Sequence, residues 1–264
     1  MNLRWRAIPG SGLAVLGVAA WSVVAPPARA DLPALIDQIK PSIVAIGSYK
    51  ATNNPPFSIR GTGFVVRNGT LVATNAHVVG AIAGEGDGVA IVAQVSSGAS
   101  GESQRRGIRV IAVDRSHDLA VLELDGPPLP ALPLGRSDAV REGQAVAFTG
   151  FPIGAVLGFY PATHRGIVSA ISPIVLPTPT ARSLNEQVIK RIKTGAFKIF
   201  QLDATAYPGN SGSPVFDATT GEVLGIINMV FVKGSKEAAL TQPSGITYAI
   251  PAEHLQALLP ERSR

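Results

Sequence analysis

A short glycine-rich turn is the first feature of this sequence that could carry chemistry. Residues 208–214 read PGNSGSP, so the hydroxyl of Ser211 lies between two glycines and just ahead of the strand-like pair Val215-Phe216. A nucleophilic serine needs an exposed Oγ, nearby backbone N–H groups that can face a developing oxyanion, and no bulky neighbour. The turn meets these needs, but taken alone it describes a plain hairpin connection equally well.

Four histidines could supply the base that a serine hydroxyl requires at neutral pH. His77 lies in the segment TNAHVV over 74–79, where a predicted strand ends and can present an imidazole into a cleft. His117, His164 and His254 have weaker contexts, before a strand, after a loop and in a predicted helix. For each of the four, a hydrogen-bonded structural histidine is the alternative.

A carboxylate at the entrance of an apolar strand could orient the imidazole. Asp118 directly precedes the run LAVL over 119–122, and a charge in that place is costly unless it has a partner. Such an aspartate holds a catalytic imidazole and stabilises its cation. Asp118, His77 and Ser211 are therefore candidates for one nucleophilic site, although they are remote along the chain.

The segments that must position these residues have the pattern of short strands. Val- and Ile-rich runs recur between Gly, Pro and Asn clusters, and this spacing predicts an all-β barrel or sandwich rather than alternating β-α units. The runs cover Ser42–Tyr49, Gly63–Val66, Thr70–Thr74, Val89–Val95, Gly107–Val113, Leu119–Leu124, Ala145–Thr149, Gly166–Ile171, Lys198–Leu202, Gly221–Asn228 and Gly245–Ala249.

A proline-rich stretch divides these strands into two groups. Residues 125–141 contain four prolines and little periodicity, so they cannot form a central strand. We therefore expect a first barrel over 42–125, a linker over 126–142 and a second barrel over 143–250.

Three short helices are expected outside the strands. The first follows Asp31 and runs through Lys40, where Pro41 ends it. A capping box opens an inserted helix over Ser183–Lys193, within the long insert Pro173–Ala196. The third covers Pro251–Leu259 and lays a leucine face back on the barrel.

Composition limits the chemistry and the partners. The 264 residues include no cysteine, which excludes a disulfide scaffold, a thiolate metal site and a cysteine nucleophile. The formal charge is +5, but residues 1–30 hold three arginines and no acid. The remaining 20 basic and 18 acidic residues give +2, with no basic block of the kind that nucleic-acid binding requires.

The first thirty residues have the layout of a secretory signal peptide. Arg4 and Arg6 precede an apolar run over Leu13–Ala25, and an Ala-x-Ala pattern ends at Ala30. We expect cleavage there, export to the periplasm or the exterior, and a mature chain over 31–264 without a membrane anchor. An uncleaved anchor is the alternative, although a run of this length is short for a membrane span.

The chain resembles the HtrA/Deg type of chymotrypsin-fold serine proteases. The triad motifs TNAHVV around His77, DLAVL from Asp118 and GNSGSP around Ser211 occur in the family's order. Further matching segments span most of residues 42–259: GTGFVV at 61–66, GFP at 150–152, GIVSA at 166–170, QLDA at 201–204 and YAIP at 248–251. The resemblance implies a two-barrel fold with the nucleophile in the second barrel and its partners in the first.

The resemblance also implies peptide-bond hydrolysis. Ser211 would attack the carbonyl, His77 would accept and return the proton, and Asp118 would hold the imidazole. The backbone N–H groups of Gly209 and Ser211 would form the oxyanion hole. Polypeptides, unfolded proteins among them, would be the substrates, and neither a metal nor another cofactor is implied. A trimer is a family expectation, but composition locates no interface.

By the same resemblance, the primary specificity pocket would be built from Thr205 and Ala206 and from the segment Asn228, Met229 and Val230. None of these positions carries an acid, so a preference for Lys or Arg is not expected. The histidine that glutamyl endopeptidases place in the later segment is also absent. We therefore predict a small or medium aliphatic residue on the acyl side of the cut.

Two departures from the family pattern bear on function. Ser213 replaces the glycine common at that place and is a second candidate nucleophile. Only thirteen residues follow Pro251, so a substrate-binding PDZ module is not expected, and the 173–196 insert takes the place of a sensor loop. The main rival hypothesis is a secreted binding or scaffold protein that keeps the barrels without hydrolysis.

Overall fold

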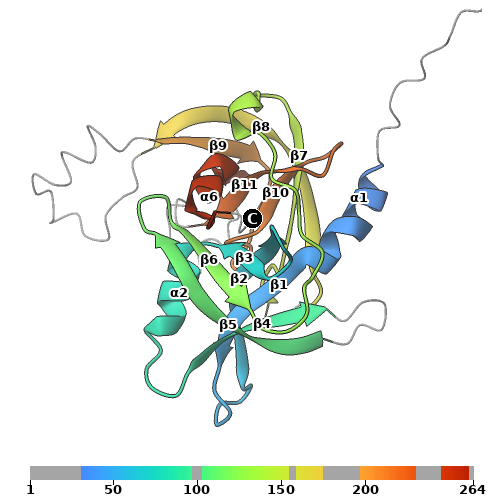
Figure 1. Cartoon of the computed structure of the whole chain (residues 1–264). Coiled ribbons are helices and arrows are strands. Elements are labelled where there is room, and N and C mark those ends of the chain that lie inside the picture. Colours follow the sequence, from blue (N-terminus) through green and yellow to red (C-terminus); the bar gives the residue numbers. More distant parts are fainter. Residues whose placement is uncertain (1–30, 97–102, 155–158, 175–196, 230–244, 262–264) are drawn as a thin grey trace, which may run out of the picture.

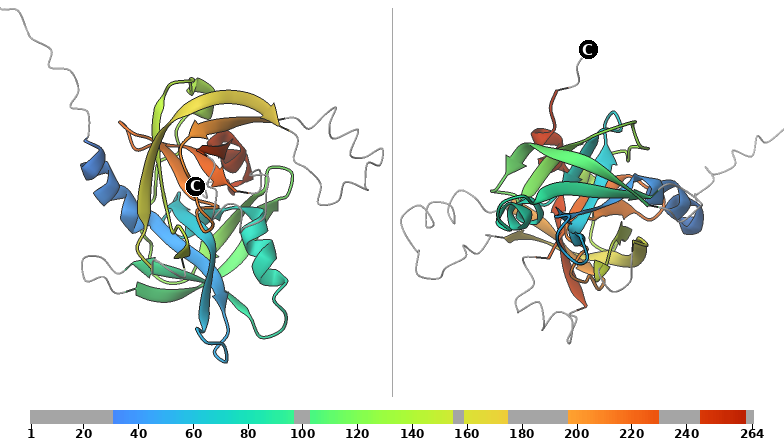
Figure 2. Two further views of the ribbon diagram at one scale, coloured as in Figure 1. Left: turned by 180° about the vertical axis from the view of Figure 1, so that it is seen from behind. Right: turned by 90° about the horizontal axis from the view of Figure 1, so that it is seen from below.

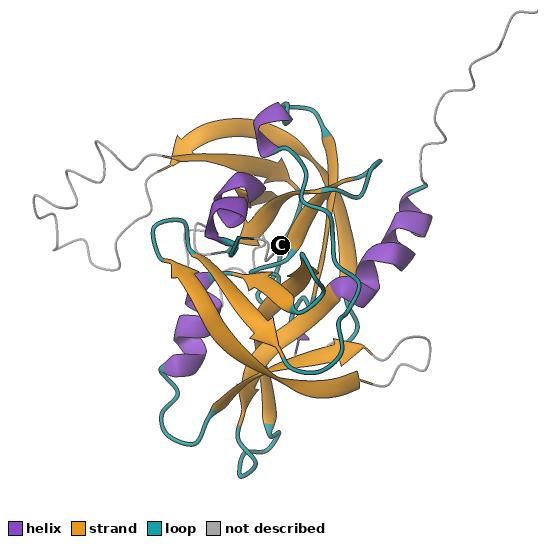
Figure 3. Ribbon diagram, viewed as in Figure 1, coloured by secondary structure: helices purple, strands orange, loops and turns teal. Residues whose placement is uncertain are grey.

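Two closed antiparallel β-barrels make up most of the molecule, as the strand pattern predicted (Figures 1 and 3). The computed structural model describes residues 31–96, 103–154, 159–174, 197–229 and 245–261. The first barrel contains β1 (Ile43–Tyr49), β2 (Phe57–Val66), β3 (Leu71–Thr74), β4 (Ala90–Ser96), β5 (Ser103–Asp114) and β6 (Leu119–Leu124). The second contains β7 (Ala145–Gly150), β8 (Ala162–Ile174), β9 (Phe197–Asp203), β10 (Pro214–Asp217), β11 (Val223–Asn228) and β12 (Ile246–Pro251).

The two barrels have the same closed order of six strands. In the first the order is β1-β2-β3-β6-β5-β4, and β1 closes the ring by pairing with β4. In the second it is β10-β11-β12-β9-β8-β7, and β10 closes the ring by pairing with β7. Closure leaves neither sheet with an unpaired edge along its ladder. Each barrel therefore offers a rigid frame for the loops at its rim.

Each barrel has its own apolar interior, and a third core lies where the barrels meet. The interface core includes Phe64 of β2, Leu119 of β6 and Phe216 of β10, all at 0% exposure. Packing apolar side chains from both barrels into one cluster removes them from water together, so the barrels are held in a fixed relation.

The linker and the C-terminal helix cross the junction between the barrels. Leu132 N–H donates to Val65 O of the first barrel (2.9 Å), and Gly135 N–H donates to Val223 O of the second (2.8 Å). The helix α6 (Ala252–Leu258) buries Leu255 in the interface core.

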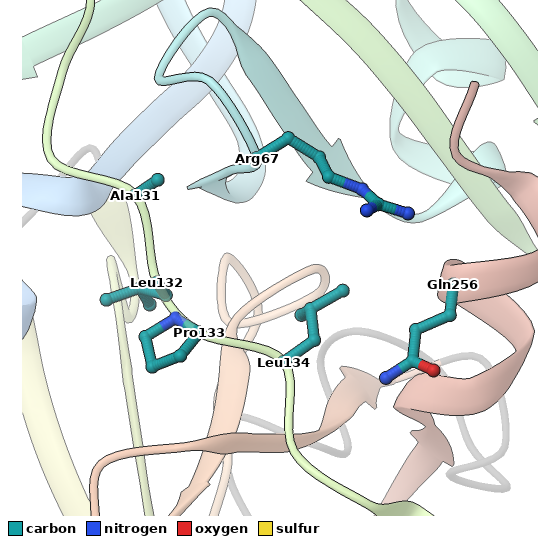
Figure 4. Close-up of a pocket in the computed structure, with 6 residues that line it drawn as sticks. All are labelled: Arg67, Ala131, Leu132, Pro133, Leu134 and Gln256. Atoms are coloured by element: carbon teal, nitrogen blue, oxygen red, sulfur yellow. The ribbon is translucent and has the colours of Figure 1, made fainter. Parts of the chain in front are cut away.

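A cavity of about 440 Å³ lies between linker and helix, with Arg67 and Gln256 on its walls (Figure 4). None of the predicted site residues lines it.

Two of the three expected helices are described, and both are confirmed. The N-terminal one is α1 (Leu32–Ile39), followed by the 3-10 turn η1 (Lys40–Ser42), and the C-terminal one is α6. A second 3-10 turn, η2 (Ser137–Ala139), belongs to the linker. The helix predicted over Ser183–Lys193 lies outside the described residues.

One helix was not predicted from the sequence. The segment after β3 forms α2 (Ala76–Ala83), which begins at the residue before His77. Its sequence AHVVGAIA is apolar and rich in β-branched residues, so local propensity does not favour a helix. Burial of Val78, Val79 and Ile82 against the first barrel overrides that preference. The helices α1 and α2 lie on opposite sides of the molecule (Figures 1 and 2).

Candidate active site

A buried carboxylate joins the predicted base to both barrels. His77 Nδ1 lies 2.6 Å from Asp118 Oδ2, and His77 N–H donates to Asp118 Oδ1 at 2.8 Å. From the second barrel, Asn228 Nδ2 donates to Asp118 Oδ2 at 2.7 Å. Because an ionised carboxylate only accepts, His77 carries its proton on Nδ1 and keeps the Nε2 lone pair free to accept another. This is the tautomer that a general base needs.

The local backbone explains how Asp118 reaches this position. Asp118 has a φ of 54°, in the left-handed region that aspartate tolerates better than most residues. Its carbonyl accepts hydrogen bonds from Ala76 N–H (3.1 Å) and from Asn75 Nδ2 (3.1 Å). Carbonyl and carboxylate together thus supply acceptors for the first N–H groups of α2, which have no partner inside the helix. The position of Asp118 and the start of α2 therefore depend on the same hydrogen bonds.

Asn228 enters the site in a way that sequence reasoning missed. Asn228 was predicted to line the primary pocket, whereas its side-chain amide binds Asp118 and the residue is 0% exposed. The alternation of strand β11 sets this direction: Ile226 packs in the interface core and Ile227 in the second barrel, so the next side chain, Asn228, returns to the interface. The polar end of an otherwise apolar strand was the available signal in the sequence.

The turn that carries Ser211 is held from several sides. Within it, Asn210 N–H donates to Tyr207 O (2.9 Å) and Ser213 N–H to Asn210 O (3.0 Å). Gly209 and Gly212 have φ values of 101° and 87°, which side chains rarely allow. A Cβ on Gly212 would overlap the Thr62 carbonyl and one on Gly209 the Phe151 carbonyl. Glycine is therefore required at 209 and 212, because the backbones of Phe151 and Thr62 approach these positions too closely for a side chain.

The first barrel contacts this turn directly beside His77. Thr62 N–H of β2 donates to Ser211 O at 2.8 Å. At Gly61 an added Cβ would lie 2.6 Å from Val78 Cγ2 and 3.0 Å from Ser211 O. Val78, the residue after His77, and the Ser211 backbone therefore both lie close to Gly61. The Ser211 hydroxyl and His77 Nε2 form no hydrogen bond with each other. Catalytic hydrogen bonds are often long in structures without substrate.

The backbone N–H groups of Gly209 and Ser211 have no acceptor among the described residues. The carbonyl of Pro208 accepts Ile153 N–H at 2.7 Å. Because C=O and N–H point in opposite directions across a trans peptide, the Gly209 N–H is directed away from Ile153. Two unpaired N–H groups beside a hydroxyl are what stabilisation of an oxyanion requires.

The residues predicted for the primary pocket occupy one end of the second barrel. Ala206 is 7% exposed, and its N–H donates to Thr247 Oγ1 at 3.1 Å. Met229 packs against the core of the same barrel, and Thr205 is half-buried between strand and turn. Val230 lies outside the described residues.

The other three histidines make structural contacts. His117 Nδ1 lies 2.5 Å from Asp114 Oδ2, and its ring stacks on His254 of α6 with 4.0 Å between centroids. Burial, followed by repulsion from His117, lowers the pKa of His254 to about 4. His164 stacks on Phe148, and burial lowers its pKa. The geometry thus brings only His77 to the carboxylate of Asp118.

Across the five described ranges, no three His, Asp or Glu side chains gather as metal ligands would. None of the helices in those ranges is long and apolar enough to span a membrane.

The family is shown by comparison with known proteins. The model of the trypsin-like peptidase domain matches residues 61–226, and the chain belongs to this family. Its relatives are of the HtrA type. A probable periplasmic serine endoprotease, DegP-like, from Pseudomonas fluorescens is 30% identical over 73% of this chain and 33% of its own length. A putative serine protease HhoA from Synechocystis is 31% identical over 75% of this chain and 42% of its own.

A solved structure supports the same relationship. The HtrA-type protease AlgW with a tripeptide is 26% identical and has a TM-score of 0.60, over 86% of this chain and 62% of that one. The chain thus spans one third to two fifths of the length of the curated relatives described above.

Replacing Gly150 by alanine tests the packing under the turn at residues 208–214, which we call the nucleophile turn after its candidate nucleophile, Ser211. A Cβ at Gly150 would overlap Ser213 Oγ and lie 2.8 Å from Thr62 Oγ1 and 2.9 Å from Asn210 Oδ1. We expect Gly150→Ala to lower the free energy of unfolding by about 1–3 kcal/mol, the usual cost of overpacking, as measured by urea denaturation.

The matched control is Gly80→Ala in α2, where an added Cβ meets nothing within 4 Å. This change should raise the free energy of unfolding by up to about 1 kcal/mol, because alanine is the better helix former. Equal stability of the Gly150→Ala variant and the parent would contradict the packing described here.

Proposed function

We propose that this protein is a serine endopeptidase that hydrolyses peptide bonds through an acyl-enzyme on Ser211. The observation that carries the proposal is the Asp118 carboxylate, which binds His77 Nδ1 at 2.6 Å, while Nε2 bonds none of the described residues. Membership of the trypsin-like peptidase family supports it, as do relatives whose names describe serine proteases.

The mechanism follows from these groups. Ser211 Oγ attacks the carbonyl carbon while His77 Nε2 takes the hydroxyl proton, and the imidazolium is stabilised by Asp118. The oxyanion is bound by the N–H groups of Gly209 and Ser211. His77 then protonates the leaving amine, which departs and leaves an ester on Ser211. Water, deprotonated by His77, hydrolyses that ester and restores the serine. No step requires a metal.

Labelling with a fluorophosphonate probe tests the nucleophile. The parent chain and Ser213→Ala should be labelled, and Ser211→Ala should not, because only Ser211 lies beside the two unpaired N–H groups. Gel fluorescence and mass spectrometry of the labelled peptide provide the readout. Labelling that is lost only in Ser213→Ala would assign the nucleophile to Ser213. A folded parent chain that takes no label would favour a binding protein without hydrolysis.

The proposed cleavage preference is a small or medium aliphatic residue, such as Ala or Val, on the acyl side. It is supported by two apolar, uncharged residues: Ala206 belongs to the core of the second barrel, and Met229 is partly buried against that core. His164 lies on the inner face of that barrel, 6.1 Å from the Tyr207 ring. Its lowered pKa keeps it neutral near pH 7, so it offers no positive charge to a glutamate.

A peptide library with mass-spectrometric readout at pH 7.5 measures this preference. Cleavage after Ala or Val is expected to exceed cleavage after Lys, Arg or Glu, because no described pocket residue carries a charge. Dominant cleavage after a charged residue would contradict the proposal.

Export is proposed from the first thirty residues. The basic start, the apolar run and the Ala-x-Ala end at Ala30 support a cleaved signal peptide, and so does the word periplasmic in a relative's name. The mature protein would act on polypeptides, including unfolded ones, in the periplasm or outside the cell. Mass spectrometry of the protein purified from a secreting host should find Asp31 as the first residue. An N-terminus upstream of Leu13 would instead indicate a tethered enzyme.

A further inference from the structure

The Thr62 hydroxyl connects the nucleophile turn to a second loop, because it both donates and accepts a hydrogen bond. This residue of β2 is fully buried. Its Oγ1 donates to Gly209 O at 2.7 Å and accepts a hydrogen bond from Phe151 N–H at 3.0 Å. The roles are fixed by chemistry, because a carbonyl can only accept and a backbone N–H can only donate. The hydroxyl has therefore one proton and one lone pair committed to two different loops.

Those two loops also contact each other at the peptide that forms the oxyanion hole. Ile153 N–H, two residues after Phe151, donates to Pro208 O at 2.7 Å. Pro208 O and the Gly209 N–H belong to the same peptide group and point in opposite directions. Thr62 Oγ1 thus holds the Gly209 carbonyl on one side of this peptide and the 151–153 turn on the other. The peptide is clamped from both ends.

Without the Thr62 hydroxyl, this peptide would keep the bond from Ile153 N–H to Pro208 O and lose the support of both flanking loops. Gly209 has a φ of 101° and no side chain, so its own conformational preferences hardly restrict it. Loss of the Thr62 hydroxyl would take away the described partner of the part-buried Gly209 O and of the buried Phe151 N–H, and such groups seek new partners. Rotation of the 208–209 peptide would remove a hydrogen-bond donor from the oxyanion hole and turn a carbonyl oxygen toward it.

We propose that Thr62 is a positioning residue of the first barrel, whose hydroxyl orients the Gly209 N–H toward the oxyanion. This inference rests on the proposed function, since it assigns a role in the same hydrolysis. It goes beyond the triad, because Thr62 bonds the backbone of the turn and makes no bond to the Ser211 hydroxyl, His77 or Asp118. It makes oxyanion stabilisation in the second barrel depend on a side chain of the first.

Three variants of the full chain test the role of the hydroxyl. Valine has the shape of threonine without the hydroxyl, alanine leaves more room, and serine keeps both hydrogen bonds. The substrate probe is a fluorescence-quenched peptide with valine on the acyl side, replaced by the best library peptide if that differs. Thr62→Val and Thr62→Ala should lose about 100-fold in kcat, the usual effect of removing one oxyanion donor. KM should change far less, because the donor acts mainly in the transition state.

Thr62→Ser should restore kcat to within about threefold of the parent, since it keeps the donor and the acceptor. The matched control is Thr149→Val, which removes another fully buried hydroxyl, one that lies 2.8 Å from Thr163 Oγ1 and bonds no part of the nucleophile turn. It should leave kcat near the parent value, which separates the loss of a buried hydroxyl in general from the loss of positioning. All rates are measured well below the melting temperatures and per folded molecule.

Several outcomes would overturn the proposal. One is a kcat loss in Thr62→Val no larger than that in Thr149→Val. Another is equal impairment of the serine and valine variants. If the valine and alanine variants both fail to fold while the serine variant folds, the hydroxyl serves folding and not positioning. A parent chain that is not labelled by fluorophosphonate would instead refute the proposed function itself, so the two failures are distinguishable.

Discussion

One buried carboxylate organises the site. Asp118 accepts hydrogen bonds from the backbone and imidazole of His77 in the first barrel and from the Asn228 amide in the second. A carboxylate taken from water is costly unless such partners replace its hydration. The three donors therefore hold Asp118 in place, and Asp118 in turn fixes the ring orientation of His77 and the start of α2. Because one donor comes from β11, this arrangement exists only when the two barrels are docked.

The nucleophile turn depends on the same docking. Thr62 N–H binds Ser211 O, the Thr62 hydroxyl binds Gly209 O, and Gly212 packs against the Thr62 carbonyl. A turn rich in glycine has many conformations when alone, and ordering it costs conformational entropy. Contacts from a closed barrel select one of these conformations. The second barrel thus supplies the hydroxyl and the N–H groups, while the first supplies much of their orientation.

The fold class, the order of the site residues and the two described terminal helices were predictable because they depend on local patterns. Strand-like runs separated by turn residues indicated barrels, the prolines over 127–133 indicated a linker, and apolar spacing indicated the helices. The contact between His77 and Asp118 could be expected from motif resemblance. The helix α2 could not, because its β-branched residues become helical through packing against the barrel and not through propensity.

The sequence alone determined which chemical groups are available: one hydroxyl between glycines, an imidazole, a carboxylate, and no thiol. It did not determine where the Asn228 amide points or that Thr62 reaches the nucleophile turn. Thr62 and Gly209 are 147 residues apart, and no local pattern records a contact of that range. These roles arise when the whole chain packs, because the direction of a side chain across an interface follows from strand register and barrel docking.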